Sequence, residues 1–281
     1  MHSDIAFMRL LILAVACCAL GGIRAEEPIH WYLTVDEASA QAIPENRPMM
    51  IDFWATWCLP CEVMEQKVYS TAEFRKATQK FLLVRINYDK KTALARKYNV
   101  DTLPMIVFAD SYGNELFRYQ GYVGVAPLLA LVDALPGDVT EFNRLGRILA
   151  RDKNDFEALD AMGKRLKQAG LFRASSDYYA RAAQEPEARS NPERLETIFN
   201  EVGLNFLAVR DGMLAAEWFD RCLRKFPASP RKVQWKLNLA QAYAFGEKKD
   251  KQKARRILET LIQADPAAPD SDKARRILAS L

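Results

Sequence analysis

The stretch Ile51-Asp52-Phe53-Trp54-Ala55-Thr56-Trp57-Cys58-Leu59-Pro60-Cys61 decides how the first half of this chain folds. Its apolar part, Met49 to Trp54, predicts a short buried strand, and the cysteine pair that follows begins a helix over Glu62 to Val68. A helix start presents free N–H groups and a partial positive charge, which stabilise a thiolate. We therefore expect Cys58 to be the exposed nucleophile and Cys61 to be the buried resolving thiol.

A C-x-x-C pair can also be half of a zinc site, but a zinc site takes about four ligands. Without the leader described below, the other cysteine and histidine of the chain are Cys222 and His30. Because only these two residues remain as sulfur or nitrogen donors beside the pair, we expect no metal. Two thiols at this spacing can instead close a disulfide without moving the backbone.

Asp52 interrupts an otherwise apolar strand, and burying a carboxylate is costly. One interpretation is an aspartate at the strand edge that faces solvent. The other is a buried proton acceptor for Cys61 when a mixed disulfide is resolved, with a pKa that desolvation raises.

The segment Thr102-Leu103-Pro104-Met105 has two interpretations as well. The proline can simply mark the start of the strand that follows. Alternatively, it forms a cis-proline loop that faces the cysteines. There the backbone of Leu103 pairs with an extended substrate chain, while Pro104 has no N–H to donate.

Strand-like and helix-like segments alternate from residue 30 to residue 135. The expected strands are Met49–Trp54, Phe81–Tyr88, Met105–Ala109 and Glu115–Tyr119, the last two joined by a turn at Asp110–Asn114. The expected helices are Glu62–Val68, one opened near Phe74 by the capping box Ser70–Glu73, Thr92–Tyr98 and Val125–Leu135. This order predicts an α/β domain with a mixed sheet.

These motifs together resemble the thioredoxin superfamily over about residues 28 to 136. The likeness is strongest to its exported group, which includes the C-terminal periplasmic domain of the transmembrane thiol–disulfide interchange reductase. The resemblance to the superfamily rests on Asp-Phe-Trp-Ala, Trp-Cys-x-Pro-Cys, the strand end Arg85–Asp89, Leu103-Pro104, Gly113 and Gly124. The resemblance to the exported group rests on Trp31, Asp36–Ala38 and Gly121-Tyr122.

The resemblance implies a thioredoxin-like fold in which Cys58 attacks, Cys61 resolves and Asp52 relays protons. It also implies that Pro104 is the cis-proline and that Trp57, Leu103 and Pro104 contact the substrate. Two positions depart from the pattern of the family. Leu59 stands where thioredoxin has glycine, and Glu62 replaces a frequent lysine, adding negative charge beside the thiols.

The second half, residues 139–281, contains no strand-like segment, and its apolar residues recur at helical spacing. The change falls at Pro136-Gly137-Asp138, which places the domain boundary there. Three series of small, aromatic and proline residues resemble the tetratricopeptide repeat, at spacings somewhat longer than its period of about 34 residues. They are Gly163, Leu166, Gly170, Phe172, Tyr179, Ala182 and Pro186; Gly203, Phe206, Ala215, Phe219, Cys222 and Pro227; and Ala240, Tyr243, Ala254, Leu258, Leu261 and Pro266.

Residues 1–25 have the layout of a secretory signal peptide, with Arg9 before a short apolar run and small residues up to Ala25. Cleavage after Ala25 or after Gly21 fits this layout. A lipoprotein signal ending at Cys17 is a less favoured alternative. We expect export, most simply to a bacterial periplasm, where disulfides form and persist.

The composition excludes several classes of protein. The net charge of +4 over 281 residues does not indicate nucleic-acid binding, and two histidines argue against a Ser–His–Asp site. Cys222 is interpreted as a buried small residue, with a regulatory thiol as the alternative. The basic run Lys248–Lys253, continuing to Arg256, is expected at a turn between helices, either solvated or contacting an acidic partner.

The sequence thus predicts an exported thiol–disulfide oxidoreductase that acts on protein thiols and disulfides. The proline of Leu59-Pro60 and the absence of a histidine there favour a reductase fed by a membrane electron donor. The helical repeats are expected to bind a protein partner. Two alternatives stay open: a repeat scaffold with little redox activity, and an oxidase or isomerase that uses the same residues.

Overall fold

The computed structural model describes residues 29–281 of the chain. The predicted signal peptide over residues 1–25, its cleavage sites and the lipidation alternative at Cys17 lie outside the described residues. None of the described helices has both the length and the apolar character needed to cross a bilayer.

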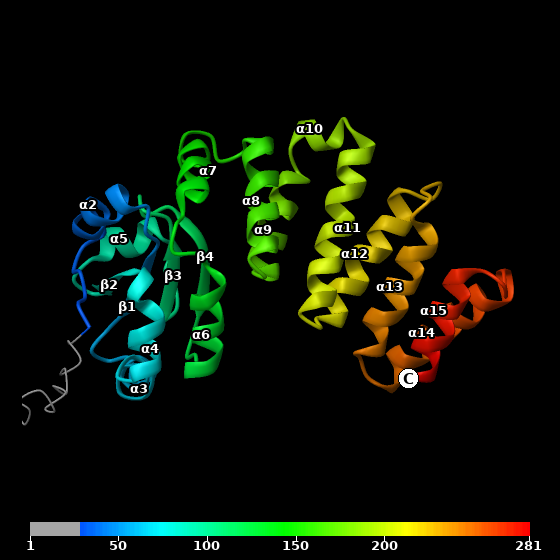
Figure 1. Cartoon of the computed structure of the whole chain (residues 1–281), viewed down its shortest axis with the longest axis horizontal. Coiled ribbons are helices and arrows are strands. Elements are labelled where there is room, and N and C mark those ends of the chain that lie inside the picture. Colours follow the sequence, from blue (N-terminus) through cyan, green and yellow to red (C-terminus); the bar gives the residue numbers. More distant parts are fainter. Residues whose placement is uncertain (1–28) are drawn as a thin grey trace, which may run out of the picture. The chain divides into compact units, whose positions relative to one another are not determined.

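A four-stranded mixed sheet forms the centre of the first half (Figure 1). Its strands are β1 (Met49–Trp54), β2 (Leu82–Asn87), β3 (Met105–Ala109) and β4 (Glu115–Gln120), arranged in the order β2-β1-β3-β4. β1 is parallel to β2 and antiparallel to β3, and β3 forms the predicted hairpin with β4. The expected α/β domain with a mixed sheet is confirmed.

One face of the sheet packs against α2 (Val35–Glu45) and α5 (Thr92–Lys97). Alternate β1 residues, Met49, Ile51 and Phe53, point into this apolar layer. Helix α2 was not predicted from the sequence; its N-cap is Thr34, and it contains Pro44 near its end. Because strand side chains alternate, Asp52 points to the opposite face.

Tyr69 of a π-helical turn, η1 (Glu65–Tyr69), contacts Asp52 on that face. The turn continues α3 (Leu59–Met64) and is followed by α4 (Ala72–Ala77), which packs on α6 (Val125–Ala134), and by a 3-10 turn, η2 (Thr78–Lys80). The helix predicted over Glu62–Val68 therefore starts earlier and widens at Glu65. The predicted capping box is displaced by one residue. Thr71, not Ser70, is the N-cap of α4, because its hydroxyl accepts from the Phe74 N–H at 3.2 Å.

The second half is helical, as expected. Its helices are α7 (Thr140–Arg151), α8 (Phe156–Gln168), α9 (Phe172–Ala182), α10 (Pro186–Arg189), α11 (Pro192–Ala208), α12 (Gly212–Lys225), α13 (Lys232–Ala244), α14 (Lys248–Ala264) and α15 (Pro269–Ala279). Successive long helices pack as neighbours, α8 on α9, α11 on α12 and α13 on α14. The basic run from Lys248 begins α14 and does not form the expected turn, because lysine and arginine are good helix formers.

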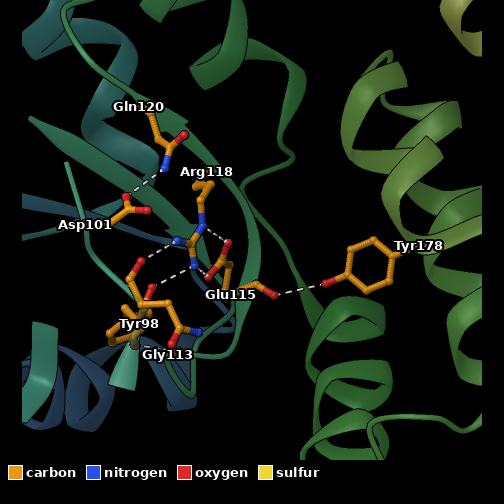
Figure 2. A network of polar contacts seen from close by, with 8 residues as sticks. Tyr98, Asp101, Gly113, Glu115, Arg118, Gln120 and Tyr178 are labelled. Carbon is orange, nitrogen blue, oxygen red and sulfur yellow. Dashed lines mark hydrogen bonds and ion pairs between the residues drawn. The ribbon is translucent and has the colours of Figure 1, made fainter. Parts of the chain in front are cut away.

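Buried polar contacts join the helical half to the sheet domain. The Asn143 side chain of α7 accepts from the Ser111 N–H at 2.9 Å and donates to Asn46 Oδ1 at 3.0 Å. In α9, the Tyr178 hydroxyl donates to the Glu115 carbonyl at 3.0 Å (Figure 2). The Glu115 carboxylate pairs with Arg118, so the start of β4 is held from both sides.

Candidate active site

The cysteine pair lies where β1 ends and α3 begins. Cys58 is the N-cap of α3, and its Sγ accepts from the backbone N–H of Cys61 at 3.3 Å. Cys58 and Cys61 form a disulfide with their Cα atoms 5.3 Å apart. The strand, the place of the pair at the beginning of a helix and the pairing of the two cysteines agree with the sequence prediction, although the helix starts at Leu59 instead of Glu62.

The expected exposure of Cys58 is wrong for this oxidised structure. Cys58 is 5% exposed and Cys61 4%, so both are buried. The cover comes from the end of β1 and from two loops, because Trp54, Tyr88 and Leu103 pack against the pair. The nucleophile therefore lies just below the surface.

The Leu103–Pro104 peptide bond is cis, as the loop interpretation predicted. Leu103 packs against the cluster that contains the cysteines, so this loop faces them. The carbonyl of Pro104 accepts from the Gly121 N–H at 2.8 Å, which ties the loop to the end of β4.

An apolar surface flanks the disulfide. Trp57 is 63% exposed and Leu59 73%, values unusual for large apolar side chains next to a buried pair. The Trp57 Nε1–H donates to Asp89 Oδ2 at 3.0 Å, which holds the indole in place. Asp89 is the last residue of the Arg85–Asp89 segment, one of the motifs on which the thioredoxin resemblance rests, and no role was predicted for its side chain.

Asp52 is 2% exposed, which rules out the solvent-facing interpretation. Its Oδ1 accepts from the Tyr69 hydroxyl at 3.1 Å, and its Oδ2 lies 3.5 Å from Arg85 Nε. Burial raises the pKa of Asp52 to about 6, although Arg85 and the Tyr69 hydroxyl both favour the ionised form. The predicted upward direction of the pKa is therefore confirmed.

Comparison with known proteins identifies the fold family. Residues 35–136 match the thioredoxin-like domain family. Over 105 residues the chain is 33% identical to thioredoxin from Mycolicibacterium smegmatis, a match that covers 37% of this chain and 92% of that protein. The chain belongs to the thioredoxin-like family. With the Cys58–Cys61 disulfide, these relatives support a thiol–disulfide oxidoreductase.

Two further relatives share the name DsbD. The thioredoxin-like residues are 36% identical over 86 positions to the thiol:disulfide interchange protein DsbD of Cronobacter sakazakii, covering 29% of this chain and 15% of that protein. The chain thus spans a small part of DsbD's length. The oxidised C-terminal domain of DsbD from Neisseria meningitidis aligns at 20% identity and a TM-score of 0.32, covering 36% of this chain and 96% of that domain.

Sequence reasoning missed two neighbours of Asp52 in this thioredoxin-like site, Tyr69 and Arg85. The Arg85 guanidinium lies 4.6 Å from the Trp54 ring centroid and 5.7 Å from that of Trp31. Its Nη1 pairs with Glu65 at 2.5 Å. A signal for Arg85 was present, because it interrupts apolar β2 as Asp52 interrupts β1, and the two are register partners.

Cys222 lies far from this chemistry in the sequence and belongs to a different core. It is a free, fully buried thiol packed in the cluster with Phe219 and Trp235. Burial raises its pKa to about 12, so the thiol stays protonated. The interpretation as a buried small residue is therefore confirmed. Within residues 29–281, no three His, Cys, Asp or Glu side chains gather as a metal site.

Proposed function

We propose that this protein is an exported thiol–disulfide reductase whose helical half binds a protein partner. The observation that supports the redox part is the Cys58–Cys61 disulfide at a helix start, next to a cis-proline loop and a buried carboxyl at Asp52. A scaffold with an inert bridge has no need of a buried ionisable group in the same strand.

The reaction is thiol–disulfide exchange. The Cys58 thiolate attacks a substrate disulfide, a Cys58–substrate bond forms, and the second substrate sulfur leaves as a thiolate. Asp52 then accepts the proton of Cys61, and the Cys61 thiolate attacks Cys58. The substrate leaves as a dithiol with two electrons gained, and the protein is left with its Cys58–Cys61 disulfide. A membrane thiol donor returns those electrons.

Substrate contacts follow from the surface beside the pair. Exposed Trp57 and Leu59 offer an apolar platform for an unfolded or extended segment. The backbone of Leu103 pairs with that segment, and buried Pro104 shapes the loop without donating a hydrogen bond.

We assign residues 139–281 to a tetratricopeptide-like solenoid, following a thioredoxin-like domain over residues 28–136. Support comes from small residues at helix crossings. A Cβ at Gly163 would lie 2.8 Å from the Tyr179 ring, and one at Gly203 would lie 2.8 Å from the Phe219 ring. The helices of each pair therefore approach closely where the repeat resemblance requires it.

A groove of about 840 Å³ runs between α8, α9 and α11. Two ion pairs line the groove, Lys167 with Glu201 and Arg194 with Glu157, so it presents both positive and negative charge. Such a surface suits a polar segment of a protein partner.

Export rests on the leader over residues 1–25, and a bacterial periplasm is the proposed location. The lipid-anchored form at Cys17 is the less favoured version. Trapping with Cys61→Ser in cells tests location and partners together, because substrates stay bound covalently to Cys58. Exported proteins on the trap support the proposal, and cytosolic proteins alone contradict it.

Insulin reduction tests the activity directly. We expect the wild-type protein to reduce insulin disulfides and Cys58→Ser to lose essentially all of that rate, because no thiolate remains to attack. Equal rates would instead support the scaffold. Equilibration with glutathione tests the direction. A potential near the value of about −270 mV typical of thioredoxin supports a reductase, whereas one near about −120 mV identifies an oxidant.

A further inference from the structure

The π-helical turn η1 continues α3 without a break and carries Glu65 at its start and Tyr69 at its end. π-turns are rare and often occur at functional sites. Both residues belong to the surroundings of Asp52. Tyr69 donates its hydroxyl hydrogen to Asp52 Oδ1, and Glu65 pairs with Arg85, which lies beside Asp52 Oδ2.

The two oxygens of Asp52 have unequal partners. Tyr69 makes a hydrogen bond at 3.1 Å, whereas Arg85 Nε is 3.5 Å away and is buried without a hydrogen-bond acceptor among the described residues. Arg85 therefore supplies charge, and Tyr69 supplies the directed hydrogen bond to the carboxylate. A donor to the ionised form stabilises that form.

Packing fixes the position of the Tyr69 hydroxyl. The ring is 3% exposed and lies between Trp31, at 5.3 Å between centroids, and Phe74, at 4.9 Å. Burial raises the pKa of Tyr69 well above its ordinary value, so the hydroxyl keeps its proton and remains a donor. The helix predicted from the sequence ended at Val68, so Tyr69 had no predicted role.

We propose that Tyr69 is the positioning residue that holds Asp52 as an ionised proton acceptor for Cys61. The inference rests on the proposed exchange reaction and adds a residue to it. The charged or titratable groups that act on Asp52 are Arg85 from β2 and Glu65 and Tyr69 from η1. Tyr69 acts through Asp52 and does not touch the reacting sulfurs.

The test is Tyr69→Phe, which removes the hydroxyl and keeps the ring. The carboxyl carbon resonance of Asp52, followed by NMR in the oxidised protein, should titrate about 0.5 to 1 pH unit higher than in the wild type. In single-turnover experiments below neutral pH, Cys61 of the variant should expel thionitrobenzoate from a Cys58 mixed disulfide about three to ten times more slowly than in the wild type. The pH profile of this rate should move to higher pH by the same amount, about 0.5 to 1 pH unit.

Tyr98→Phe is the matched control. Tyr98 is also a buried tyrosine of this domain, but its hydroxyl donates to the Gly113 carbonyl at 2.6 Å, away from Asp52. It should leave both the titration and the pH profile unchanged. In an Asp52→Asn background, Tyr69→Phe should have no further effect on the profile.

An unmoved Asp52 titration in Tyr69→Phe overturns the inference, as does an equal displacement in Tyr98→Phe. A second measurement needs no variant, because the Tyr69 hydroxyl proton resonance of the wild type should shift as Asp52 titrates; a constant resonance also contradicts the proposal. If the wild type fails to reduce insulin while the Asp52 titration still moves in Tyr69→Phe, the proposed function fails and the coupling stands.

Discussion

Asp52 shows how one buried carboxyl links chemistry to stability. Its pKa rises from 3.8 to about 6 on folding, mainly because burial penalises the charged form. The folded protein therefore binds this proton more tightly than the unfolded chain does. The resulting stabilisation is fully present below pH 3.8 and is lost as the pH rises through about 6.

Asp52→Asn should remove that pH dependence. Between acid and neutral pH, the pKa change from 3.8 to about 6 should lower the unfolding free energy of the wild type by about 3 kcal/mol. The variant should not show this loss, because asparagine does not titrate. Urea unfolding of both oxidised proteins at several pH values measures the difference, in which all other carboxylates cancel. Parallel stability curves for the two proteins would contradict the burial argument.

The sequence predicted the reactive residues better than their surroundings. Cys58, Cys61 and Pro104 stand in a local motif, so the disulfide and the cis-proline loop could be expected from spacing and resemblance. Tyr69 could not, because its hydroxyl reaches Asp52 only through the packing of η1 on the sheet. The burial of Cys58 likewise depends on loops distant in the sequence.

At the scale of elements, the strands were the most predictable. Met49–Trp54 and Met105–Ala109 were predicted at their observed bounds, because each is an apolar run bounded by residues that break strands. Helix α2 was missed, since a proline at position 44 and few apolar residues obscure its period. The widening at Glu65–Tyr69 has no compositional signal, so only the structure reveals it.

Close approach of helices gives a prediction at this scale. Gly212 begins α12, and a Cβ there would lie 2.4 Å from the Ala242 carbonyl oxygen of α13. Because backbone cannot rotate away as a side chain can, Gly212→Ala should lower the unfolding free energy by about 1–3 kcal/mol. The control is Gly137→Ala, whose Cβ would meet its nearest atom, on Lys80, at an ordinary 3.5 Å. Chemical denaturation compares them, and equal stabilities would refute the steric argument.

At the scale of the whole molecule, the domain boundary predicted near residues 136–139 leaves α7 on the helical side. Yet Asn143 of α7 is buried and bridges Ser111 of the β3–β4 turn and Asn46, the C-cap of α2. The Val139 N–H also donates to the Asn46 carbonyl at 2.8 Å. We expect α7, although assigned to the helical half, to stabilise the sheet domain as well.

Asn143→Ala should therefore destabilise the sheet domain. It leaves the fully buried Ser111 N–H without its acceptor, at a cost of about 1–3 kcal/mol. Asn154→Ala removes an exposed asparagine just beyond α7 and should change stability by less than about 0.5 kcal/mol. Equal losses in the two variants would show that the bridge carries no stability.

The contacts of α7 also determine where the chain can be divided into stable fragments. A fragment of residues 31–153 keeps α7 and its bridge to Asn46 and Ser111, whereas one of residues 31–138 loses both. The longer fragment should be the more stable by about 1–3 kcal/mol, because the shorter one loses the hydrogen bonds that Asn143 makes to Asn46 and Ser111. Thermal unfolding of the oxidised fragments measures this. Equal unfolding midpoints of the two fragments would place the domain boundary before α7, as the composition of residues 136–138 first indicated. They would also show that the contacts of Asn143 do not stabilise the sheet domain.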